Sequence, residues 1–131
     1  MPTILIGGYY GAGNIGDEAI LDSIVSELRA QYERPTELSL IVLSWDPEST
    51  SKTYNLEAIY WKDINALLDA GLRTDLIILG GGGIFHDYWG IDPDTYLTKN
   101  FQDITAFGSF PLLAKLFDIP CMIYAVGFGP F

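Results

Sequence analysis

The chain is poor in the residue types that form metal sites and disulfides. Among its 131 residues there is a single cysteine, Cys121, and a single histidine, His86. A lone cysteine cannot form an internal disulfide, and one cysteine with one histidine is too few for a zinc site. We therefore expect no bound metal and a reducing, cytoplasmic setting.

Positive charge and long apolar runs are also scarce. Lys and Arg number 7 against 17 Asp and Glu, so the net charge is −10. A surface this acidic repels nucleic acid, whose phosphates proteins normally meet with clusters of Lys and Arg. The longest apolar runs, such as residues 119–126, are far shorter than the roughly 20 residues that cross a bilayer. Residues 1–8 also lack the basic start of a signal peptide. We therefore expect neither nucleic-acid binding nor a membrane-spanning segment.

What the chain does have is enough apolar surface for one folded domain over residues 1–131, since 49 % of its residues are hydrophobic and 18 % are charged. Apolar runs alternate with amphipathic segments, an order typical of βαβ units and a parallel sheet. The predicted fold is α/β, a Rossmann-like doubly wound sheet of five parallel strands in the order 3-2-1-4-5. Residues 44–53 are expected to form a polar loop. The expected strands are residues 3–6, 38–43, 56–60, 76–79 and 121–126, and the expected helices are residues 17–31, 63–72 and 111–117.

Two glycine-rich segments follow the first and fourth predicted strands. In a doubly wound sheet the strand order reverses between these two strands, and ligands bind beyond their carboxyl ends. The segments Gly11–Gly16 and Gly80–Gly83 are both expected to be turns that border one crevice there.

The first segment matches the pattern G-x-G-x-x-G ahead of a helix. Such glycines let backbone approach a ligand, although they also serve a tight turn with close helix packing. Asp17 and Glu18 place negative charge where a pyrophosphate would lie, which disfavours a dinucleotide site. Asp17 either faces the cleft or caps the helix. We expect it to stay ionised at the helix N-terminus, which suits hydroxyl binding or a base better than an acid.

The second segment holds more glycine than a packing turn needs, which favours contact between its backbone and a ligand. His86 and Asp87 follow directly. His86 can shuttle a proton or bind a sugar hydroxyl, or it can simply bond nearby backbone. The next connection is crowded with aromatic residues, which can stack on sugars, cover the end of the sheet or pack against a second domain. Burial against a partner is favoured for these residues, which are Tyr88, Trp89, Tyr96, Phe101, Phe107 and Phe110.

Three segments carry a resemblance to a known family. Residues 8–21 (GYYGAGNIGDEAIL) resemble the opening signature of the polysaccharide pyruvyl transferases, closest to the cell-surface-anchoring type. Residues 79–87 (LGGGGIFHD) resemble their second glycine-rich segment, in which the position of His86 is often polar. Residues 124–130 (YAVGFGP) resemble the third, with Val126 and Phe128 at positions where members vary.

The resemblance implies one lobe of a two-lobe enzyme built like the GT-B glycosyltransferases. Members transfer the pyruvyl group of phosphoenolpyruvate to two hydroxyls of a nucleotide- or lipid-linked sugar, forming a ketal for a cell-wall or extracellular polysaccharide. No metal or organic cofactor is implied, and a peripheral membrane contact of the whole protein stays open. The second lobe is expected to lie outside this chain. It is also expected to bind most of the phosphoenolpyruvate, so the chain alone should be inactive.

On this resemblance the candidate catalytic residues are Asp17 and His86. The candidate substrate-binding residues are Tyr10, Gly11, Gly13, Asn14, Gly16, Glu18, Gly81, Gly82, Gly83 and Asp87. None of the seven basic residues lies in either glycine segment, and Lys99 is the one expected to reach the crevice. The alternative functions are a GT-B glycosyltransferase lobe, a nucleotide-binding module and a non-catalytic interaction lobe.

Overall fold

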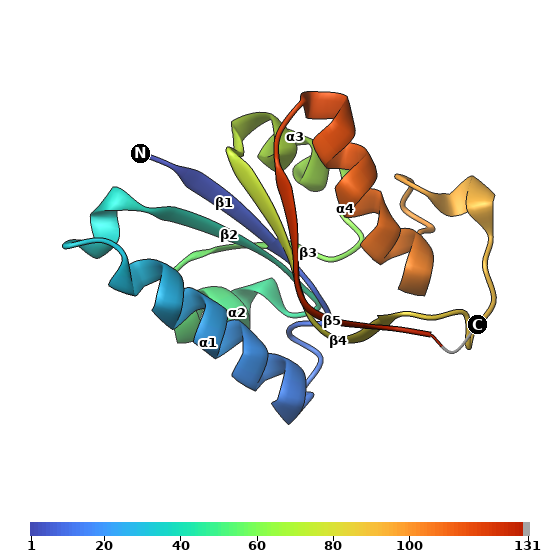
Figure 1. Cartoon of the computed structure of the whole chain (residues 1–131), viewed down its shortest axis with the longest axis horizontal. Coiled ribbons are helices and arrows are strands. Elements are labelled where there is room, and N and C mark those ends of the chain that lie inside the picture. The colour runs from blue at the N-terminus through green and yellow to red at the C-terminus, as the bar shows by residue number, and fades with distance from the viewer. Residues whose placement is uncertain (130–131) are drawn as a thin grey trace.

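The computed structural model describes residues 1–129 as a twisted five-stranded sheet with helices on both faces (Figure 1). Every strand pairing is parallel and the order is β3-β2-β1-β4-β5, so the predicted α/β fold and topology are confirmed. Pro130, the last residue of the third family segment, lies outside the described residues. The strands are β1 (Thr3–Gly7), β2 (Ser39–Ser44), β3 (Glu57–Tyr60), β4 (Leu76–Phe85) and β5 (Cys121–Phe128).

Alternate side chains of the central strands enter two separate cores, as the twofold repeat of a strand requires. Leu5 of β1 packs on the face covered by α3 and α4, whereas Ile4 and Ile6 pack on the face covered by α1 and α2 (Figure 1). The helices that form these two layers are α1 (Ile15–Ala30), α2 (Pro47–Tyr54), α3 (Ile64–Arg73) and α4 (Asp103–Phe117). Short 3₁₀ turns occupy Pro35–Glu37 and Pro93–Thr95.

The start of α1 is fixed by Asn14 and not by Asp17. The Asn14 Oδ1 accepts a hydrogen bond from the Asp17 backbone N–H at 3.2 Å, which is an N-cap interaction. Because Asn14 caps the helix, the carboxylate of Asp17 is free to face another part of the molecule.

The prediction of a polar loop over residues 44–53 is wrong, because α2 lies there. Asp46 caps this helix by accepting from the Ser49 N–H at 3.1 Å, Pro47 occupies the first turn, and Asn55 ends it with a left-handed φ of 51°. The segment is rich in Ser and Thr, which disfavour helix interiors and favour turns. Its two ends therefore define the helix more than its interior does.

The prediction that the fourth strand stops at Leu79 in a glycine turn is also wrong. Pairing with β5 continues through Gly80 and Gly82 to Phe85, with a register shift between Gly82 and Phe85. Gly81 and Gly82 have φ values of 76° and 83°, which glycine adopts at little cost. The glycine run is thus an irregular stretch of strand, and β4 and β5 extend together past the rest of the sheet (Figure 1).

Helix α4 begins eight residues before the expected start at Pro111, which lies inside it. As a result, Phe107 and Phe110 belong to α4, and together with Phe101 they are buried in the core on the face of the sheet covered by α3 and α4. The expectation that the aromatic stretch packs against a partner is wrong for these three residues. Tyr88 and Trp89 alone among the larger rings of that stretch are mostly exposed in the described chain.

Candidate functional site

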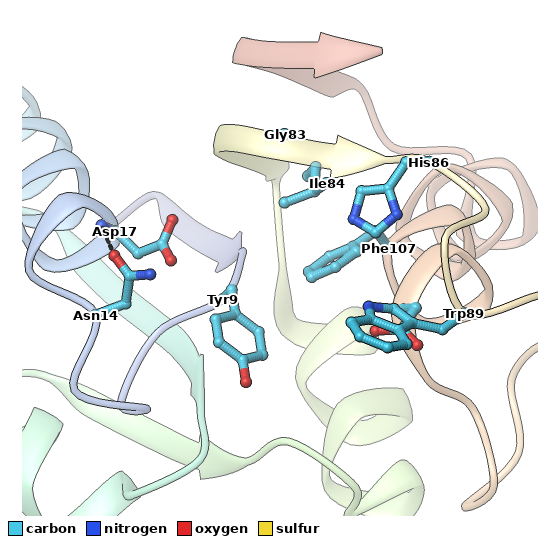
Figure 2. A pocket seen from close by; sticks show the side chains of 9 residues that line it. Tyr9, Asn14, Asp17, Gly83, Ile84, His86, Trp89 and Phe107 are labelled. Carbon is cyan, nitrogen blue, oxygen red and sulfur yellow. Dashed lines mark hydrogen bonds between the residues drawn. The ribbon is translucent and has the colours of Figure 1, made fainter. Parts of the chain in front are cut away.

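A cavity of about 360 Å³ opens where β1 and β4 end, at the reversal of strand order. The first glycine segment and the extended end of β4 border it together, as the predicted crevice requires. Figure 2 shows Asn14 and Asp17 on one side, His86, Trp89 and Phe107 on the other, and Tyr9 between them. The lining is completed by Gly83, Ile84 and Asp103.

The run of four glycines is explained mainly by packing. A Cβ on Gly80 would meet Ile24 of α1 and the Tyr10 hydroxyl, and a Cβ on Gly81 would overlap the Ile20 side chain. On Gly82 it would lie 3.2 Å from Asp17 Oδ1. The three glycines therefore let α1 approach β4 closely.

Gly83 differs from the three glycines before it. No atom lies within 4 Å of a Cβ added there, and the residue is exposed on the cavity wall. Of the three glycines predicted to bind substrate in this run, Gly83 is the one that borders the cavity, whereas Gly81 is buried.

Tyr10, which was predicted to bind substrate, belongs to the core on the α1 side and does not line the cavity. Its side chain is 1 % exposed, and its hydroxyl donates to the Gly80 carbonyl oxygen at 3.0 Å. Burial raises the pKa of this phenol far above its usual range, with Asp17 and Glu18 adding to the effect. The phenol therefore stays protonated and links the residue before the first glycine segment to Gly80 of the second.

Glu18 holds the first glycine segment from inside the protein. Its Oε1 accepts from the Gly11 N–H at 2.8 Å and its Oε2 accepts from the Tyr54 hydroxyl at 2.9 Å. Burial, together with this hydrogen bond, raises the pKa of Tyr54 to about 12. In a dinucleotide site the N–H groups of such a loop bind phosphate, so an internal carboxylate at Gly11 leaves less room for that role.

Asp17 lines the cavity and accepts no hydrogen bond from any residue of the described part of the chain. Burial raises the pKa of its carboxyl, and the charge of Glu18 raises it further. Desolvation and the neighbouring carboxylate thus act against the helix dipole, and the expectation that Asp17 stays ionised at the helix N-terminus stays a prediction. Asp17 retains a proton to a higher pH than an ordinary aspartate, which makes it better suited to act as an acid.

His86 lines the same cavity in a fixed orientation. The Tyr88 backbone N–H donates to its Nδ1 at 3.3 Å, and the centroids of the two rings are 4.3 Å apart. An Nδ1 that accepts a hydrogen bond places the proton of the neutral imidazole on Nε2. His86 therefore accepts a hydrogen bond from nearby backbone, one of the two roles predicted for it, and also carries an N–H donor beside the cavity.

The remaining predicted residues do not line the first cavity. Gly11, Gly13 and Glu18 border a second cavity of about 350 Å³ beside α2. Gly16 is exposed in the first turn of α1, and neither Gly16 nor Asp87 lines the first cavity. The cavity residues absent from the predicted set are Tyr9, Ile84, Trp89, Asp103 and Phe107. The aromatic stretch pointed to Trp89 and Phe107, but nothing pointed to Asp103, since the start of α4 was misplaced.

Within residues 1–129 no group of three or more His, Cys, Asp or Glu side chains is arranged to hold a metal ion. In the same residues, no helix combines the length and the apolar character that crossing a membrane requires.

The fold and the cavity define a doubly wound α/β protein with a cavity at the reversal of strand order, the place where proteins of this fold bind their ligands. The family model of the polysaccharide pyruvyl transferases matches residues 14–131, about nine-tenths of the chain. The chain therefore belongs to the polysaccharide pyruvyl transferase family. No curated protein and no solved structure matches it.

Proposed function

We propose that this chain forms the acceptor-sugar side of an enzyme that transfers the pyruvyl group of phosphoenolpyruvate to a sugar of a cell-wall or extracellular polysaccharide precursor. Family membership supports the transfer of a pyruvyl group within polysaccharide synthesis. The observation that carries the assignment of this side is the lining of the first cavity. That lining combines aromatic rings with carboxylate, amide and imidazole groups and contains no Lys or Arg.

This lining suits a neutral polyhydroxy ring. Carboxylates such as Asp17 accept strong hydrogen bonds from hydroxyls, and the Nε2 of His86 can donate one. Aromatic faces such as those of Tyr9 and Trp89 offer flat apolar surface to the C–H face of a sugar.

The same lining is unsuited to phosphoenolpyruvate by itself. That substrate carries a carboxylate and a phosphate, which proteins bind with Arg or Lys in fork-like contacts. In our proposal those cations come from a second lobe outside this chain, and the two lobes close on the substrates in the manner of GT-B enzymes.

The proposed reaction needs one proton donor and two sugar hydroxyls. A proton is added to C3 of phosphoenolpyruvate as the C2=C3 double bond opens, and one hydroxyl oxygen attacks C2. The C2–O bond to phosphate then breaks, and a second hydroxyl closes the ketal. Of the two hydroxyl protons, one replaces the proton given to C3 and the other leaves with phosphate. Asp17, whose pKa is raised, is the proposed acid, and His86 is the proposed partner for a hydroxyl.

The proposed acceptor is a nucleotide- or lipid-linked sugar in the cytoplasm, and no metal or organic cofactor takes part. The test incubates a protein carrying both lobes with phosphoenolpyruvate and candidate acceptors, and measures phosphate release together with the ketal carbon by NMR. We expect phosphate release that depends on both substrates. Consumption of a sugar nucleotide without phosphoenolpyruvate would instead assign a glycosyltransferase and refute the proposal.

A further inference from the structure

Two residues of the cavity wall lie outside both glycine segments. Trp89 belongs to the connection after β4 and is 75 % exposed, which is unusual for the largest side chain. Asp103 is the first residue of α4 and adopts a φ of 48°, a left-handed conformation that is costly for a residue other than glycine. The side chain of Asp103 accepts no hydrogen bond and forms no ion pair within residues 1–129.

The connection that carries Trp89 is anchored to α4 by two buried hydroxyls. The Thr95 hydroxyl donates to Thr105 Oγ1 at 2.9 Å, and the Leu97 N–H donates to Ser109 Oγ at 3.1 Å. Thr105 also accepts from the Gln102 N–H at 3.0 Å, directly before Asp103. Hydrogen bonds to α4 therefore hold the part of the connection that runs from Thr95 to Gln102, which ends directly before Asp103.

We propose that Trp89 and Asp103 determine which acceptor this cavity accepts: the indole stacks on one face of a neutral pyranose, and Asp103 accepts hydrogen bonds from its hydroxyls. The identity of this ligand as the acceptor rests on the proposed function. Asp17 and Asp103 come from helices on opposite faces of the sheet, so a ring between them meets a carboxylate from each. Two carboxylates without a Lys or Arg repel an anionic sugar, so the site selects neutral pyranosides over uronates.

The selection can be measured by equilibrium binding to the 131-residue chain. Methyl pyranosides of the gluco, galacto and manno series are titrated, each beside the matching uronate, with saturation-transfer NMR as the readout. We expect at least one neutral pyranoside to bind at millimolar concentration and its uronate to bind at least about tenfold more weakly, since one repelled charge is worth a factor of that order.

Variants separate the two roles. Trp89→Ala should lower the affinity for the neutral sugar by about five- to tenfold. It should not change the preference over the uronate, because an aromatic face contacts the C–H face of the ring and does not distinguish its charge. Asp103→Asn should lower the affinity for the neutral sugar, because a strong hydrogen-bond acceptor is lost. It should also reduce the ratio of the affinities for the neutral sugar and the uronate, because one repelling charge is removed. The matched controls are Tyr124→Ala, an exposed aromatic on β5, and Asp94→Asn, an exposed acid outside the cavity lining. Both should bind as the unchanged chain does.

The proposal is overturned if no pyranoside binds, if uronates bind as well as neutral sugars, or if Asp103→Asn leaves the preference unchanged. A folding defect is recognised by a loss of melting temperature in the variant and is bypassed by Asp103→Glu, which keeps the charge and should keep the preference. Sugar binding without phosphoenolpyruvate-dependent phosphate release would refute the proposed function while leaving the selective site in place.

Discussion

The two glycine-rich segments look alike in sequence but make different contacts with the rest of the protein. In the first, the N–H of Gly11 is bound by the carboxylate of Glu18, so part of its donor capacity is used within the protein. In the second, three of the four glycines give space to α1 and Tyr10, and Gly83 alone borders open space. The comparison teaches that a glycine run identifies close approach by some group, and that the approaching group is often the protein itself.

The strongest test of this difference is to add side chains to glycines of the second segment. Gly81→Ala adds a Cβ that overlaps Ile20 at a φ of 76°, so we expect the free energy of unfolding to fall by about 2–4 kcal/mol. Gly83→Ala is the matched control, because its Cβ meets no atom, and it should cost less than about 1 kcal/mol. Urea denaturation of both variants measures the difference. Equal losses would mean that packing does not explain the run.

The next largest effect is expected from Asp17, which follows the first segment and faces Gly82 of the second. In a protein carrying both lobes, Asp17→Asn should lower turnover at least about tenfold, since a positioned proton donor contributes a factor of that order or more. The rate of the unchanged enzyme should fall as the pH rises through the raised pKa of Asp17, and this limb should vanish in the variant. A pH–rate profile measures both, and an unchanged rate would remove Asp17 from the reaction.

Stability should respond to Asp17 in the opposite sense. Because its folded-state pKa is raised, the folded chain binds more protons than the unfolded chain between the two pKa values, and stability falls as the pH rises through that interval. Asp17→Asn should therefore melt with the unchanged chain at acidic pH and up to about 2 °C above it near neutral pH. The effect is small because the group is largely screened by solvent. A variant that loses stability toward neutral pH would contradict the assigned direction.

The first segment can be tested through Glu18. Glu18→Gln removes the charge that binds Gly11 and Tyr54, so we expect a loss of about 1–2 kcal/mol in unfolding free energy. The pKa of Tyr54 should fall from about 12 toward the ordinary tyrosine value, which ultraviolet titration against Tyr54→Phe can isolate. Glu27→Gln, an exposed acid on the same helix, is the control and should change neither quantity. A Tyr54 pKa that stays high would show that burial and the charge of Asp22 raise it without Glu18.

The smallest expected signal is the binding of phosphoenolpyruvate to the 131-residue chain. Calorimetry of the 131-residue chain should detect no micromolar binding, because no Lys or Arg lines the first cavity. Micromolar binding would overturn the proposed division between two lobes, and Lys99→Ala would then be the variant to examine.

The sheet was predictable because each strand is a short apolar run between breakers, and the parallel order follows from the intervening helices. Helix α2 was not predictable in the same way, since a segment rich in Ser and Thr is typical of a loop. Its capping by Asp46 depends on geometry that the sequence does not show. The continuation of β4 was hidden because glycine has no β propensity, so only the partner strand reveals it. Asp103 was missed for a related reason: its place on the cavity wall depends on where α4 starts.

The central position of β1 has a consequence for how the chain is made. Residues 3–7 leave the ribosome well before β4, so the edge of β1 that pairs Ile4 with Leu76 has no partner until about 70 more residues have been synthesised. At ordinary synthesis rates of roughly 5–20 residues per second this interval is about 4–14 s. During that time an apolar strand exposes an open edge that can pair with other chains. Pairings this distant in sequence also slow the closure of the sheet. Nascent chains halted before residue 76 should therefore bind chaperones more strongly than chains halted after β4 has emerged.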